Sequence, residues 1–234
     1  MITTIKPNVL SRTLLLFMMA VILLAGVSCD SSPPPEQQEP AENKPATDNR
    51  GVIVAMGDSL TSGLGVPPED AYPAQLERLL AERGHDYRVI NAGISGETSS
   101  GARSRVNWVL KLKPDIVILE TGANDGLRGI DPTLIEDNIE QIIVRLKEED
   151  ITIVLAGMMM VTNLGKDYIA NFNSIYPRLA QKHQVILMPF FLQDTATEPS
   201  KNQADGIHPN SEGYRIITVN LLPFVEKAIT SDSQ

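Results

Sequence analysis

From Gly51 onward, segments with strand character alternate with segments of helical spacing, and this alternation most constrains the fold. The segments predicted as strands are residues 52–56, 88–90, 116–119, 151–155 and 185–188. Helical patterns follow them at about 73–83, 101–112, 132–149, 166–182 and 211–228. Short connections in such an alternation require right-handed crossovers and a mainly parallel sheet. The sequence therefore predicts a three-layer α/β/α domain with a five-stranded, mainly parallel sheet.

The beginning of the chain looks like a targeting segment. Lys6 and Arg12 precede an uninterrupted apolar run, 14–27. The run has the length of a signal-peptide core and is shorter than the about 20 residues of a comfortable membrane span. It ends just before Cys29, the chain's only cysteine, which excludes an internal disulfide.

A small residue before a cysteine at the end of such a run resembles a bacterial lipoprotein signal, although Gly26 stands where a branched aliphatic residue is usual. We therefore predict a signal peptide over residues 1–29, with Cys29 lipidated. A signal cleaved to release a soluble protein and an uncleaved anchor helix are the alternatives.

Residues 30–50 are rich in proline, glutamate, glutamine and serine and contain no large apolar side chain. Such a segment cannot bury enough surface to fold, and its prolines favour a semi-extended chain. We predict a disordered linker that holds the domain of residues 51–234 off a membrane, in the bacterial cell envelope facing the periplasm. A leader without a role fits the composition equally well.

The net charge and the number of potential metal ligands limit which partners and cofactors the chain can bind. The net charge of −9 argues against a nucleic-acid binder, because phosphates require a basic face. With three histidines, one cysteine and no carboxylates at ligand spacing, the sequence also argues against a metal site. We predict no metal and no cofactor.

Polar and glycine-rich segments follow the first three predicted strands: "MGDSLTSG" with Ser59, "NAGISGETS" with Gly93 and Gly96, and "ETGANDG" with Asn124. Each signal is weak alone, because a serine in such a turn is more often a helix cap, and the others are common turn formers. Their shared placement is more specific. The carboxyl ends of parallel strands form the usual site of such sheets.

A fourth segment, "ADGIHP", places Asp205 three residues before His208. By itself it is either an ordinary polar turn or an Asp–His pair. Together the four segments resemble the sequence blocks of the SGNH (GDSL) hydrolase family, whose fold is flavodoxin-like. The resemblance covers the whole domain. Within the family it is strongest to the bacterial thioesterases, arylesterases and lysophospholipases, supported by "FNSIYPRLA" and "MPFFL".

The resemblance implies roles for particular residues. Ser59 would be the nucleophile, His208 its general base and Asp205 the residue that orients the imidazole. The oxyanion would be bound by the backbone N–H groups of Ser59 and Gly96 and by the side-chain amide of Asn124. Gly93 is the alternative donor to Gly96.

Other polar and apolar residues admit structural interpretations. Asp58 and Asp125 are predicted to accept hydrogen bonds that brace loops, rather than to form a catalytic carboxylate pair. Met158, Met159, Met160, Phe190 and Phe191 follow the fourth and fifth strands. They either pack in the core or line an acyl groove, since methionine adapts to varied apolar chains.

We therefore predict a serine esterase that cleaves acyl esters or thioesters through an acyl-enzyme, with aryl esters and lysophospholipids as plausible substrates. One alternative is a deacetylase of envelope carbohydrate, against which the Met and Phe clusters count. Another is a binding lipoprotein with a catalytically inactive fold, although every catalytic position holds a competent residue.

Overall fold

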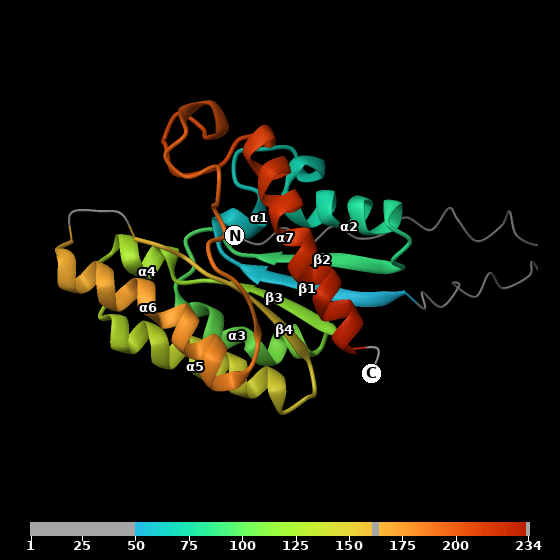
Figure 1. Cartoon of the computed structure of the whole chain (residues 1–234), viewed down its shortest axis with the longest axis horizontal. Helices are drawn as coiled ribbons and strands as arrows, with labels where there is room; N and C mark the ends of the chain where they lie inside the picture. Colours follow the sequence, from blue (N-terminus) through green and yellow to red (C-terminus); the bar gives the residue numbers. More distant parts are fainter. Residues whose placement is uncertain (1–49, 161–163, 233–234) are drawn as a thin grey trace, which may run out of the picture. The chain divides into compact units, whose positions relative to one another are not determined.

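The computed structural model describes residues 50–160 and 164–232. Within them, five parallel strands form one sheet in the order β2-β1-β3-β4-β5 (Figure 1). The strands are β1 (Gly51–Gly57), β2 (Tyr87–Gly93), β3 (Ile116–Glu120), β4 (Thr152–Ala156) and β5 (Ile186–Met188). The predicted fold class is confirmed.

Helices cover both faces of this sheet (Figure 1). Helices α2 (Tyr72–Glu82) and α7 (Ser211–Asp232) pack together on one face. The other face carries α3 (Ser99–Leu110), α5 (Pro132–Lys147) and α6 (Lys166–His183). Short elements complete the described chain: α1 (Ser59–Ser62), α4 (Ala123–Leu127), and the 3₁₀ turns η1 (Pro68–Asp70) and η2 (Pro199–Lys201).

The five predicted strands and five long helices are all present, with boundaries shifted by a few residues. Proline and capping residues explain some helix starts. Pro132 begins α5, and the Asp131 side chain caps it by accepting from the Thr133 N–H at 2.8 Å. The sequence did not predict α1 and α4. Each is a single turn or little more, too short for a helical period to be recognised.

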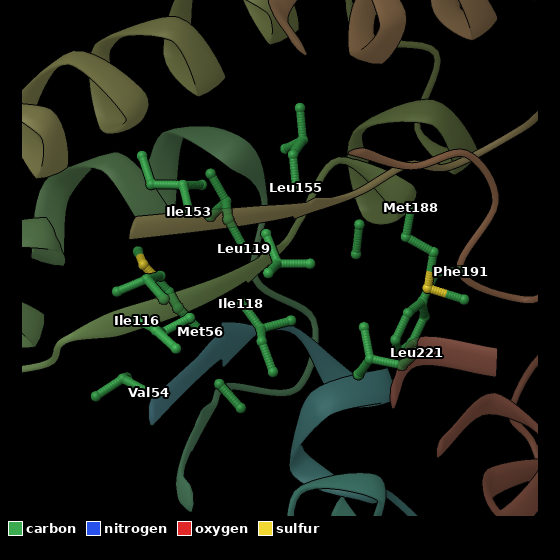
Figure 2. Packing of buried hydrophobic residues seen from close by; sticks show 14 of the residues in the cluster. Val54, Met56, Ile116, Ile118, Leu119, Ile153, Leu155, Met188, Phe191 and Leu221 are labelled. Atoms are coloured by element: carbon green, nitrogen blue, oxygen red, sulfur yellow. The ribbon is translucent and has the colours of Figure 1, made fainter. Parts of the chain in front are cut away.

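The centre of the sheet is apolar on both faces. In β3, Ile116, Ile118 and Leu119 are fully buried. Figure 2 shows them between side chains of β1, among them Met56, and side chains of β4, among them Leu155. A strand covered on both sides needs a continuous apolar sequence, as β3 has. The packing fixes where the carboxyl end of this strand lies.

Strand order reverses at β1. The chain passes from β1 outward to β2 and then returns to β3 on the other side of β1. Open α/β sheets bind ligands at the carboxyl ends of strands beside such a reversal. Ser59, Gly96 and Asn124 follow β1, β2 and β3 respectively, so all three lie at this edge.

The predicted signal peptide, Cys29 and all of the linker except Arg50 lie outside the described residues. Among the helices between residues 50 and 232 that the structure describes, none combines the length and apolar character needed to span a membrane.

Candidate active site

The turn after β1 presents Ser59. Asp58 caps α1 by accepting a hydrogen bond from the Leu60 N–H to its Oδ1 at 2.9 Å, and Ser59 is the first residue of that helix. A methyl group on Gly57 would overlap the Thr61 hydroxyl and the Glu120 carboxyl. Glycine is thus needed at position 57 because Thr61 and the end of β3 leave no space for a side chain.

The structure brings Ser59, His208 and Asp205 together across 149 residues of sequence. His208 Nε2 lies 2.9 Å from Ser59 Oγ, and His208 Nδ1 lies 2.7 Å from Asp205 Oδ2. The other Asp205 oxygen accepts from the backbone N–H groups of Ile207 and His208, at 2.9 and 3.0 Å. The backbone of this tight turn therefore holds the carboxylate in the position from which it contacts the imidazole.

The protonation of this pair follows from those contacts. The hydrogen bond with the His208 side chain, followed by the two backbone N–H groups, lowers the pKa of Asp205 to about 2. Asp205 is therefore ionised at neutral pH and accepts the Nδ1 proton in the His208 tautomer that carries its proton there. The lone pair of Nε2 then faces the Ser59 hydroxyl, as a general base requires.

Two glycines were candidates for the second oxyanion donor. The Gly93 N–H donates to Asn91 Oδ1 at 3.0 Å and is engaged. No hydrogen bond within the described residues uses the Gly96 N–H. Gly96 also has a φ of +78°, which favours glycine. The geometry favours Gly96.

A partly buried ion pair holds the loop that carries Gly96. Arg105 on α3 contacts Glu97 with its Nε at 2.7 Å and its Nη2 at 2.6 Å. The same Nη2 donates to the Gly57 carbonyl at 3.3 Å. Arg105 therefore links the loop after β2 to the end of β1.

Asn124 reaches the site from α4, but its amide is already engaged. Its Nδ2 donates to Asp58 Oδ2 at 2.9 Å and to the Glu97 carbonyl at 3.1 Å. Both N–H groups are therefore used, whereas the sequence led us to expect a donor ready for the oxyanion. An oxyanion would take one N–H in exchange, and the longer contact with Glu97 is the easier one to give up.

Asp58 and Asp125 both brace loops, as predicted. Asp125 accepts from the Ser99 N–H at 2.7 Å and the Ser99 hydroxyl at 2.6 Å. Asp58 caps α1 and also holds Asn124. Its influence on the site is therefore larger than the sequence indicated.

The sequence gave no role to Glu120, the last residue of β3, which is fully buried. Its Oε2 accepts from the Asp58 N–H at 3.1 Å and from the Thr61 hydroxyl at 2.9 Å. Burial, and then the charge of Asp58, raises the pKa of Glu120 well above its ordinary 4.5. A charged residue ending an otherwise apolar strand was the signal that could have identified it.

This raised pKa predicts how stability changes with pH. Folded Glu120 keeps its proton at pH values where the unfolded chain releases it, so its contribution to stability is complete below about 4.5 and is lost as pH rises. Glu120→Gln does not titrate. We expect its melting temperature, relative to wild type, to increase between about pH 5 and about pH 9. If the difference in melting temperature between Glu120→Gln and wild type were the same at every pH in this range, the Glu120 pKa would not be raised.

A cavity of about 640 Å³ opens beside Ser59 and His208. Met158, Met159, Met160 and Phe190 line it. Met158 and Met160 are buried and also belong to the hydrophobic core, whereas Met159 is about half exposed. The cavity wall also includes Leu127 and Ile207, which the sequence did not single out. Both are about half exposed, so the apolar lining extends to the mouth.

Of the two alternatives left open for Phe191, core packing or an acyl groove, the structure shows core packing. Its side chain is fully buried and packs edge-to-face against Tyr72, with ring centroids 5.2 Å apart. Figure 2 shows it near Met188 and Leu221, facing the core. Phe190 therefore lines the cavity, whereas Phe191 lies in the core.

In the described ranges, 50–160 and 164–232, no three His, Cys, Asp or Glu side chains gather closely enough to hold a metal ion.

Comparison with known proteins agrees with this geometry. Residues 55–216 match the GDSL-like lipase/acylhydrolase family. An arylesterase of Vibrio mimicus is 40% identical over 68% of this chain and 80% of its own length. The thioesterase 1/protease 1/lysophospholipase L1 of Escherichia coli K12 is 34% identical over 77% and 86%. The crystal structure of AlinE4, an SGNH-hydrolase family esterase, is 39% identical, covers 77% of this chain and 97% of its own, and superposes with a TM-score of 0.65.

Proposed function

This chain belongs to the GDSL-like lipase/acylhydrolase family and is a serine esterase, in which we propose that Ser59 is the nucleophile, His208 the general base and Asp205 the residue that orients it. The observation that carries this proposal is the continuous set of contacts from Ser59 Oγ to His208 at 2.9 Å and on to Asp205 at 2.7 Å. A serine hydroxyl needs such a base to be nucleophilic at neutral pH.

The proposed reaction has two halves. Ser59 Oγ attacks the acyl carbon while its proton passes to His208 Nε2, and the carbonyl oxygen becomes an anion. That anion is stabilised by the N–H groups of Ser59 and Gly96 and by the Asn124 amide. The bond to the leaving group then breaks as His208 returns the proton to it. A water molecule, deprotonated by His208, cleaves the acyl-enzyme in the same way.

We also propose that the cavity beside Ser59 holds the acyl chain. Methionine, leucine, isoleucine and phenylalanine form most of its wall, and such a wall suits an alkyl or aryl group better than a sugar. The names of the relatives, arylesterase and thioesterase/lysophospholipase, point to the same substrates. A deacetylase of envelope carbohydrate is the less favoured alternative.

A substrate panel tests this proposal. The purified domain from about residue 49 onward is assayed with p-nitrophenyl acetate, butyrate and octanoate, an acyl thioester, a lysophospholipid and acetylated xylan. We expect kcat/KM to be higher for butyrate and octanoate than for acetate, and to be lowest for the acetylated sugar. Preference for the acetylated sugar would favour the deacetylase instead.

Met159 gives a sharper prediction about the cavity. Its side chain lines the wall and is 46% exposed. In Met159→Glu the carboxylate would have to lose water when an alkyl chain binds. We expect kcat/KM for octanoate to fall about tenfold, while that for acetate changes little. Leu134→Glu, at a 50% exposed position on α5 outside the cavity, is the control. Equal losses on both esters would contradict an acyl groove at Met159.

The amino-terminal segment supports a separate proposal, that Cys29 is lipidated and anchors the protein in the cell envelope. The support is the apolar run, the single cysteine at its end and the proline-rich residues after it. Mass spectrometry of the mature protein should find a diacylglyceryl cysteine as the first residue. An unmodified Cys29, or a mature chain beginning elsewhere, would contradict the anchor.

A further inference from the structure

The fully buried Glu120 lies directly beneath the nucleophile turn, and the proposed reaction does not use it. Its Oε2 accepts two hydrogen bonds, from the Asp58 N–H and from Thr61, whose hydroxyl also lies 3.2 Å from the Tyr72 hydroxyl. Its Oε1 is buried and receives no hydrogen bond from a donor within the described residues. A buried oxygen without a partner is costly, so its chemistry needs an explanation.

The two oxygens of Glu120 have different surroundings. Oε2 behaves as a carbonyl oxygen, because both of its partners donate. The Asp58 carboxylate lies beside Glu120, and two carboxylates cannot bond to each other unless one carries a proton. A proton on Oε1 turns this orphaned oxygen into a donor toward Asp58, and the side chains of Glu120 and Asp58 then share a hydrogen bond. Burial raises the pKa of Asp58 as well, but hydrogen bonds from Leu60 and Asn124 oppose that rise, so Asp58 is the better anion of the two carboxyl groups.

Burial and the neighbouring Asp58 carboxylate favour this neutral form. The phenols of Tyr72, Tyr176 and Tyr214 are also close, but their raised pKa values leave them uncharged at neutral pH, so they add no charge beside Glu120. No Lys, Arg or His of the described chain is among the groups that shift the pKa of Glu120. Burial without a cation strongly disfavours a carboxylate.

We propose that Glu120 is a positioning residue: as a neutral acid it holds Asp58, and Asp58 in turn holds the Asn124 amide at the place where the oxyanion forms. Asn124 Nδ2 lies 2.9 Å from Asp58 Oδ2, so any movement of Asp58 moves the donor. The inference rests on the proposed role of Asn124. What is new is that Glu120, which does not touch the substrate, determines the position of the Asn124 amide through Asp58.

Two substitutions separate this role from a requirement for charge. Glu120→Gln keeps one acceptor and one donor in the shape of the protonated acid, and we expect kcat for p-nitrophenyl butyrate within about threefold of wild type. Glu120→Met fills the space but cannot bond to Asp58. We expect its kcat to fall roughly ten- to hundredfold with KM little changed, somewhat less than outright loss of an oxyanion donor. Leu146→Ala, at a buried position on α5, controls for lost stability and should keep its kcat.

A double substitution shows whether the effect passes through Asn124. In an Asn124→Ala background, adding Glu120→Met should lower kcat no further, because the positioned group is already gone. The proposal would be overturned if Glu120→Met lowered kcat by the same factor in the wild-type and Asn124→Ala backgrounds. Full activity of the single variant Glu120→Met would also overturn it. A fully active Asn124→Ala would instead refute the oxyanion role in the proposed function, so the two failures are distinguishable.

Infrared spectroscopy decides the protonation state even if Glu120→Met does not fold. The difference spectrum of wild type minus Glu120→Gln at neutral pH should contain the carbonyl stretch of an un-ionised carboxylic acid. Carboxylate bands in its place, or an activity loss of more than tenfold in a folded Glu120→Gln, would overturn the neutral positioning role.

Discussion

Replacing Ser59 by alanine is expected to lower kcat for p-nitrophenyl butyrate by about 10⁴- to 10⁶-fold, the range typical of losing a triad nucleophile. The substitution removes the hydroxyl oxygen that lies 2.9 Å from His208 Nε2. It leaves the α1 cap intact, because Asp58 rather than Ser59 accepts the Leu60 N–H. The melting temperature should therefore stay close to that of wild type.

The measurement is steady-state hydrolysis with Ser104→Ala beside Ser59→Ala. Ser104 lies on α3, where its exposed hydroxyl donates to the Gly101 carbonyl, and its loss should leave kcat unchanged. If Ser59→Ala kept more than about a hundredth of the wild-type kcat, Ser59 would not be the nucleophile.

Replacing His208 by alanine is expected to lower kcat by about 10⁴-fold or more, because Ser59 then has no base and the leaving group no acid. Asp205 cannot substitute. Its pKa of about 2 makes it a weak base, and its contacts face Nδ1 and the backbone rather than Ser59.

His85→Ala is the matched control, since His85 lies 3.7 Å from Glu226, away from the cavity wall. Added imidazole should restore part of the activity of His208→Ala by diffusing into the vacated space. An active His208→Ala without imidazole would mean that another group accepts the Ser59 proton.

The long elements of the fold could be predicted from sequence because each carries its own signal. The apolar β3 segment, for example, requires cover on both faces, and Pro132 with Asp131 marks the start of α5. Ser59 and Asn124 were predicted from motifs at strand ends, and Asp205 and His208 from the segment "ADGIHP", with roles implied by the family resemblance. The distances between them became known only once the chain was folded.

The other features of the site depend on contacts between residues far apart in sequence, which no local sequence pattern indicates. Glu120, Thr61 and Asp58 meet because β1 and β3 are neighbours in the sheet, a pairing between residues about sixty apart in sequence. Helices α1 and α4 are stabilised by what they pack against rather than by a period of their own. Phe190 and Phe191 are chemically identical, and only the path of the chain after β5 decides which one faces the cavity.

The most direct test of the central claim is covalent labelling by a fluorophosphonate, which reacts with an activated serine hydroxyl. Intact-mass and peptide mass spectrometry should find one phosphonyl group per chain, attached to Ser59, and no adduct in Ser59→Ala. A folded wild-type protein that stays unlabelled, or an adduct on a different residue, would contradict the assignment of Ser59 and His208 as the reacting pair.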